Sequence, residues 1–142
     1  MRALLLSICL LLGFAGTPML AQAQATFTPG QVWTLADPAY PSVRVVIDKI
    51  ETMGETSIVH ISLLDVPVSD RPGEGVTFAH MPFSAEALRR SVGVLVETRD
   101  GPFSDYEAGY REWQQAHGGF FTVTVPEGIA FVLQAMGNPG AH

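Results

Sequence analysis

The sequence predicts an α+β fold, in which a bent and mainly antiparallel sheet of about five or six strands has three helices packed on it. Three observations lead to this prediction. Short β-branched runs separated by Gly- and Pro-rich turns fill much of the chain. Two later segments carry apolar residues at helical spacing. Strands come first, and strands and helices then follow one another to the end of the chain. We expect the helices to cover one side of the sheet, with a small, partly open barrel as the alternative architecture.

The chain begins with the pattern of a secretory signal peptide. Met1-Arg2 supplies a positive charge, residues 3–16 are almost all apolar, and Ala21-Gln22-Ala23 places small residues before a cleavage point. We therefore expect residues 1–23 to be a signal peptide, with Ala25 offering a second cleavage frame.

Removal of that segment leaves residues 24–142, a length typical of one domain. Residues 24–30 are expected to form a flexible leader and residues 138–142 a flexible tail. The predicted location is the periplasm or the medium, with no membrane insertion after cleavage.

Composition excludes several classes of partner and chemistry. The only cysteine, Cys9, lies in the expected signal peptide, so the exported domain would have no thiol. Arg2 is the only basic residue of that segment, which leaves seven basic against fourteen acidic residues. Nucleic-acid binding needs clustered Lys and Arg, and the densest cluster is Arg89-Arg90. We therefore expect no nucleic-acid partner.

Alternating and β-branched runs predict the strands. Residues 43–51 and 56–65 flank a turn at Met53-Gly54-Glu55, which predicts an antiparallel hairpin. In the first arm Val43, Val45 and Ile47 fall on one face, and Arg44, Val46 and Asp48 fall on the other. The expected strands are 31–35, 43–51, 56–65, 75–81, 92–97 and 120–125.

Local capping chemistry predicts a short first helix. Pro82 is expected to end the preceding strand, because proline has no amide proton for the ladder. Ser84 can then cap the helix, and Phe83 and Leu88 stand at the two positions of a hydrophobic staple.

Two capping boxes predict the later helices. Ser104 and Glu107 open a helix that runs to about residue 116, with Gly118-Gly119 as its left-handed stop. Thr124 and Glu127 open the last helix, which ends at residues 137–139.

The candidate catalytic residues are His60, Ser62 and His80. His60 lies in an apolar strand on a face that it shares with Ser62, and His80 lies where a strand leads into a helix. Imidazole titrates near neutrality and suits a general base. We favour structural roles for both histidines, because the sequence assigns no activating partner to either.

The candidate binding residues are Tyr106, Tyr110 and Trp113, which lie at i, i+4 and i+7 of the expected helix. Together with Phe120 and Phe121 they could bind an apolar ligand, a sugar or a protein. The competing interpretation is that these aromatic residues form a seam of the core.

We expect no metal and no cofactor. The usual zinc spacings, a calcium loop and a phosphate-binding glycine loop are all missing from the sequence.

Three segments resemble an uncharacterised family of small secreted bacterial proteins, for which no activity is known. They are residues 59–62 (VHIS), residues 80–84 (HMPFS), and residues 109–113 (GYREW) with the later Gly119-Phe120-Phe121. The resemblance implies a location in the bacterial envelope. If it marks a site, it favours His60, Ser62, His80 and Ser84 together.

Three functions remain open at this stage. The first is a non-catalytic binding or interaction module of the bacterial envelope, whose partner is an envelope protein or a small ligand. The second is a histidine-dependent or metal-assisted hydrolase that uses His60 and His80 with a carboxylate such as Asp65. The third is a carrier of a small apolar ligand, which would need an enclosed pocket beside the aromatic helix.

Overall fold

The computed structural model describes residues 25–100 and 105–137, and contains five strands and three helices in these ranges. The strands are β1 (Gln31–Leu35), β2 (Arg44–Met53), β3 (Thr56–Pro67), β4 (Gly75–Ser84) and β5 (Val92–Thr98). The helices are α2 (Ala85–Arg89), α3 (Tyr106–Gln115) and α4 (Val125–Gly137). The expected signal peptide, Ser104 and the expected tail lie outside the described residues.

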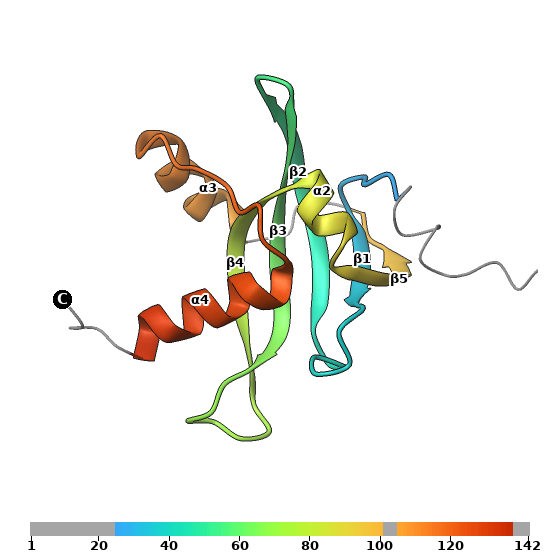
Figure 1. The fold of residues 1–142 in the computed structure, drawn as a ribbon, viewed down its shortest axis with the longest axis vertical. Coiled ribbons are helices and arrows are strands. Elements are labelled where there is room, and N and C mark those ends of the chain that lie inside the picture. The colour runs from blue at the N-terminus through green and yellow to red at the C-terminus, as the bar shows by residue number, and fades with distance from the viewer. Residues whose placement is uncertain (1–24, 101–104, 138–142) are drawn as a thin grey trace, which may run out of the picture.

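The strands form one sheet in the order β4-β3-β2-β1-β5, and every neighbouring pair is antiparallel. The predicted α+β fold is confirmed, and the sheet is open rather than closed into a barrel (Figure 1). The hairpin between β2 and β3 also forms where expected, with Gly54 at the turn. Its φ of +60° is one that glycine adopts without strain.

Two β-bulges shape the middle of this sheet. In β2, Asp48 is an extra residue between the pairs Ile47↔Ile61 and Lys49↔His60. In β4, two residues, Ala79 and His80, lie opposite Ser62 alone. His80 adopts a φ of +60°, which is unusual for any residue with a side chain. Bulges of this kind redirect side chains, and both lie beside the residues described below.

The helices cover both faces of the sheet, and the expectation that they would cover one face is wrong. The main core lies between one face and helices α2 and α4, and it includes Val59, Ile61, Phe83, Leu88 and Ile129. Figure 1 shows α4 crossing in front of β3 and β4 and extending past the edge of β4. His60 alternates with Val59 and Ile61, so its side chain points to the opposite face, where α3 packs.

Two further expectations are wrong at the edge of the sheet. β4 continues through Pro82 to Ser84, because β4 is an edge strand and the missing amide proton of Pro82 removes no bond to β3. Residues 120–125 form no strand; Phe121 makes a single parallel bridge to Phe83. The Phe121 amide donates to the Pro82 carbonyl and its carbonyl accepts from the Ser84 amide.

The helix ends follow the predicted chemistry in part. Ser84 Oγ accepts from the Ala87 amide and caps α2. Glu127 accepts from both the amide and the hydroxyl of Thr124 at the start of α4. At the end of α3 the left-handed residue is His117, with a φ of +51°, rather than a glycine.

The start of the described chain is part of the core. Ala25 and Phe27 are buried, and the Ala25 carbonyl accepts from Arg89 Nε of α2. Residues 25–30 therefore pack against the fold, in contrast to the flexible leader expected from the sequence. None of the helices within the described residues has both the length and the apolar character needed to cross a bilayer.

Candidate functional site

A chain of three polar side chains lies between the sheet and α3. His60 of β3 is completely buried, and its two ring nitrogens have different partners. Nε2 lies 2.9 Å from Glu51 Oε1 of β2, and Nδ1 lies 2.9 Å from His80 Nε2 of β4. We call these three residues the Glu51–His60–His80 chain.

The partners fix where the protons lie along this chain. A carboxylate can only accept, so His60 Nε2 carries a proton and donates it to Glu51. A neutral imidazole has one donor and one acceptor, so His60 Nδ1 accepts. His80 Nε2 is then the donor to His60, and His80 Nδ1 is left as the acceptor at the end of the chain.

The two imidazoles meet head-on. Their ring planes differ by only 17°, and their centroids are 5.1 Å apart, while the facing nitrogens are separated by only 2.9 Å. Such a large difference between the two distances requires the nitrogens to lie close to the line joining the centroids. The lone pair of one nitrogen therefore points at the proton of the other, and the pair shares a hydrogen bond rather than a common third atom.

Helix α3 covers this chain with aromatic side chains. The rings of Tyr110 and Trp113 contact His60 edge-on, with centroids at 5.0 and 4.8 Å. Tyr110 also donates its hydroxyl proton to Glu51 Oε2 at 2.8 Å, and Lys49 Nζ lies 5.2 Å from the Tyr110 ring centroid. The aromatic stripe expected on this helix is therefore directed at the histidine pair.

Gly109 allows α3 to approach the sheet closely. A Cβ atom at this position would lie 2.9 Å from His80 Cβ, closer than such atoms are found in proteins. The absence of a side chain at Gly109 thus sets the distance between α3 and the bulge in β4.

Burial and charge act in opposite directions within the chain. Burial lowers the pKa of His60, an effect that the hydrogen bond and charge of Glu51 partly offset. Burial and the neighbouring His60 lower the pKa of His80 to about 4. Burial raises the pKa of Glu51, but the hydrogen bonds from Tyr110 and His60 outweigh it, so that this pKa is lower than usual. At neutral pH the two histidines are neutral and Glu51 is ionised.

A second polar pair lies on the same face. Ser62 Oγ donates to Asp48 Oδ2 at 2.6 Å, and Asp48 Oδ1 is buried without a hydrogen-bond partner. Burial raises the pKa of Asp48 from 3.8 to about 6, against the opposing effect of the Ser62 hydrogen bond. Burial raises the pKa of Tyr106 at the start of α3, and the charges of Glu107 and Asp48 add to this effect.

These contacts differ from a metal site. Metal ligands direct their lone pairs at one point between them, whereas His60 and His80 direct theirs along a common line. Among residues 25–100 and 105–137, no group of three or more His, Cys, Asp or Glu side chains is arranged to hold a metal ion.

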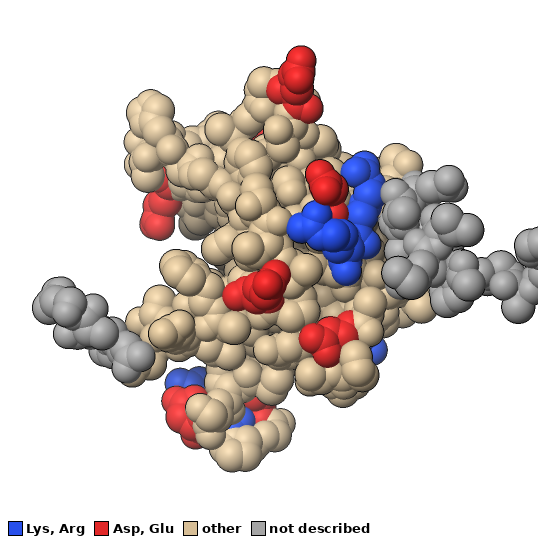
Figure 2. Space-filling view, in the orientation of Figure 1, with Lys and Arg blue, Asp and Glu red and all other residues tan. Residues whose placement is uncertain are grey.

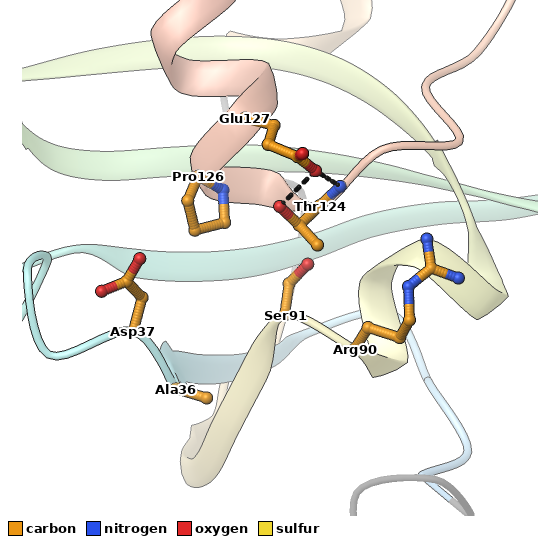
Figure 3. Close-up of a pocket in the computed structure, with 7 residues that line it drawn as sticks. All are labelled: Ala36, Asp37, Arg90, Ser91, Thr124, Pro126 and Glu127. Atoms are coloured by element: carbon orange, nitrogen blue, oxygen red, sulfur yellow. Dashed lines mark hydrogen bonds between the residues drawn. The ribbon is translucent and has the colours of Figure 1, made fainter.

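The largest of three described cavities is an open hollow of about 510 Å³ beside the start of α4. It is lined by Ala36, Asp37, Arg90, Ser91, Thr124, Pro126 and Glu127 (Figure 3). Its polar groups are engaged with the protein itself: Glu127 accepts from Thr124, Ser91 Oγ accepts from the Val125 amide, and Arg90 donates to Glu86 and to the Thr122 carbonyl.

The two smaller cavities are also open. One of about 160 Å³ lies over Ser62, Thr77, Ala79 and Arg99, and one of about 240 Å³ lies at Asp65 and Gly75. None of the three is lined by Tyr110, Trp113 or Phe120, the residues around which a ligand carrier would need an enclosed pocket.

The candidate residues therefore have different positions. His60 and His80 are in direct contact, and Tyr110 and Trp113 cover them. Ser62 shares their face but bonds to Asp48, and Ser84 caps α2. Asp65 is exposed, its backbone carbonyl accepts from Ser42, and it is not the carboxylate of the chain. That role belongs to Glu51, which sequence reasoning missed.

Two exposed apolar surfaces lie away from the histidines. In β5, the successive residues Val94, Leu95 and Val96 are 64%, 41% and 47% exposed. In α4, Phe131 and Met136 are 63% and 61% exposed. The part of α4 that extends beyond β4 is free of charged side chains in Figure 2.

Comparison with known proteins gave no match to a protein-family model, a curated protein or a solved structure.

Proposed function

We propose that this protein is a non-catalytic interaction module of the bacterial envelope, which binds an extended segment of a partner protein along β5. The observation that carries the proposal is the apolar, exposed strand at the end of the sheet. Val94, Leu95 and Val96 are consecutive and exposed, in a part of β5 where the ladder to β1 is irregular, and they leave apolar surface uncovered at this edge.

The backbone of β5 favours a strand as the occupant. Among the described residues β1 is the only strand that pairs with β5, so its outer edge presents free amides and carbonyls. The opposite edge of the sheet is partly protected by the bridge from Phe121 to Phe83. An extended peptide that joins a sheet edge satisfies the backbone groups and places alternate side chains on both faces.

The charge of the molecule favours a basic partner. The chain has fourteen acidic and eight basic residues, a formal net charge of −6. Such a charge speeds the approach of a partner of opposite sign. We therefore expect the bound segment to be apolar and to belong to a positively charged protein.

The test compares three forms of the mature domain in affinity capture from envelope extract: wild type, Val96→Lys and Met136→Lys. Lysine on an edge strand opposes the addition of another strand. A partner bound at β5 should be retained by wild type and Met136→Lys and lost with Val96→Lys. Hydrogen exchange of the complex should show new protection at residues 92–98.

Each other result would contradict the proposal. Equal retention by Val96→Lys, protection confined to residues 129–137, or retention of a small molecule without a protein would each place binding elsewhere. Circular dichroism of both variants establishes that the substitutions leave the fold intact.

A second candidate function is histidine-dependent hydrolysis, which the Glu51–His60–His80 chain favours. A carboxylate that orients one imidazole, which in turn orients a second, leaves His80 Nδ1 as a base for an attacking water. Hydrolysis of activated esters by wild type should then fall strongly in His80→Asn. Equal rates for the two proteins would remove this candidate.

A further inference from the structure

We propose that α3 is a pH-sensitive lid on the polar face of the sheet, released when the contact between His60 and His80 takes up protons. Helix α3 has no buried residue in its ten positions. The described contacts that place it on the sheet converge on the histidine pair and its carboxylate: Tyr110 and Trp113 pack on His60, Gly109 approaches His80, and Tyr110 bonds to Glu51.

The head-on contact accommodates only one proton between its two nitrogens. In the neutral pair, that proton belongs to His80 Nε2 and is accepted by His60 Nδ1. A first added proton can bind to His80 Nδ1 and leave the contact unchanged. A second must go to His60 Nδ1, which would place two N–H groups against each other at 2.9 Å. Full protonation therefore requires the rings to separate.

Separation of the rings requires movement of α3. His60 is completely buried, with Tyr110 and Trp113 over it, so a charged His60 has no access to water while the helix is in place. A buried imidazolium without water or a second acceptor is strongly unfavourable. Swinging α3 away from the sheet exposes both rings to solvent.

The surrounding charges act on the histidine pair in both directions. Lys49 on β2 adds a positive charge beside the pair, and its charge lowers the pKa of His60. Glu51 is the one nearby anion that favours the protonated rings, and it is already shared with the Tyr110 hydroxyl. On α3 itself, Tyr106 and Glu107 interact with each other near Asp48.

Asp48 opposes the release. Its pKa is raised in the folded protein, so its protonation stabilises the closed form, with α3 on the sheet, as the pH falls. Replacing Asp48 with Asn removes that opposing effect and should sharpen the response of the lid.

Protonation of the histidines favours the released form of α3. Burial lowers the pKa of both rings with the lid closed, and a released histidine returns to its ordinary value of 6.5. The closed form therefore has its full stability above pH 6.5 and loses it as the pH falls toward 4. An exported protein meets this range when its surroundings become acidic.

The experiment uses the mature domain with Trp33→Phe, because the chain has two tryptophans and this change leaves Trp113 as the only reporter. Acrylamide quenching of Trp113 is measured between pH 7.5 and 4.5, with far-ultraviolet circular dichroism at each pH. We expect the quenching constant to roughly double with a midpoint between pH 6.5 and 4, while the dichroism is unchanged.

His80→Asn is the decisive variant. Asparagine tolerates a positive φ, and its amide can donate to His60 Nδ1, but it does not titrate. The pH response of Trp113 should be largely lost in this variant. Quenching that stays constant in the parent, that responds equally in His80→Asn, or that rises only together with loss of dichroism would overturn the proposal.

A measurement on the unmodified domain provides an independent check. Hydrogen exchange at residues 105–117 should accelerate relative to residues 56–67 when the pH is lowered from 7.5 to 5, after correction for intrinsic rates. Parallel changes in the two segments would contradict a lid. This check does not depend on a partner for β5, so it stands or falls separately from the proposed function.

Discussion

Asp48 and Glu51 lie three residues apart on β2, yet their environments drive their pKa values in opposite directions. Glu51 has two hydrogen-bond donors, Tyr110 and His60, and its pKa is lowered. Asp48 has one donor, Ser62, and one oxygen without a partner, and its pKa is raised to about 6. The deeper burial of Asp48, together with the smaller number of donors that it receives, accounts for the difference.

Burial of its charge makes Asp48 a destabilising residue at neutral pH. Asp48→Asn removes the buried charge and keeps an oxygen that accepts from Ser62, so it should stabilise the protein by about 1–3 kcal/mol at pH 8. The gain should disappear as the pH falls below 4, where Asp48 is neutral in both states. Urea unfolding at the two pH values measures it, and Ser62→Ala, which removes the only donor, should be less stable at pH 8.

At the scale of elements, one close approach, between Gly109 and His80, limits how near α3 can lie to the sheet. In an exposed helix, replacing Gly with Ala usually stabilises by up to about 1 kcal/mol. At Gly109 we expect the opposite sign, because the new Cβ would press against His80 at 2.9 Å. Gly109→Ala should lower the unfolding free energy and accelerate hydrogen exchange within α3.

Gly137 in α4 supplies the matched control, because a Cβ there would meet no atom within 4 Å. Gly137→Ala should leave the stability unchanged or slightly raised. If Gly109→Ala proved equally neutral, the spacing between α3 and the sheet would not depend on this contact.

The elements also show how far the sequence could be interpreted. Period-two runs and capping residues predicted all five strands, the caps of α2 and α4, and the stripe of α3. The prediction that the strand ends before Pro82 was wrong, because proline interrupts a ladder only where its amide would face a neighbouring strand, and β4 is an edge strand. The patterns also failed at residues 120–125, because an apolar run that packs on an edge resembles one that joins the sheet.

The site was predicted only in part for a related reason. The period-two pattern of the strand correctly placed His60 and Ser62 on one face. Helical spacing correctly placed the aromatic residues of α3 on one stripe. Simple alternation from Ile47 would place Glu51 on the core face, and the extra residue Asp48 reverses that assignment. Asp65, named as a nearby carboxylate, belongs to the same strand as His60 but is exposed.

For the whole molecule, two titrations act against each other. Burial favours protonated Asp48, which adds stability as the pH falls from 6 toward 3.8. Burial favours neutral His80, which removes stability as the pH falls from 6.5 toward 4. Because these ranges overlap, we expect the unfolding free energy of wild type to change little between pH 6.5 and 4.5.

Single variants should separate the opposing effects of Asp48 and His80 on the pH dependence of the unfolding free energy. Asp48→Asn should lose stability steadily over this range, and His80→Asn should gain it, as measured by urea unfolding at half-unit steps of pH. The double variant should keep only the pH dependence of His60 and Glu51, whose lowered pKa values both remove stability as the pH falls. Matching slopes in all four proteins would mean that neither group is coupled to folding.

The extra residue in β2 also determines which single-residue deletions this strand can tolerate. Loss of the single codon for Asp48 would place Lys49 directly after Ile47, so the ladder would become regular while every later position of β2 kept its partner in β3 and its face. Glu51 would still face the histidines and Ile50 the aliphatic core, and only the acceptor of the Ser62 hydroxyl would be lost. A three-nucleotide deletion at this point should therefore be tolerated better than deletion of the codon for Ile47, which would place Asp48 opposite Ile61 in the core.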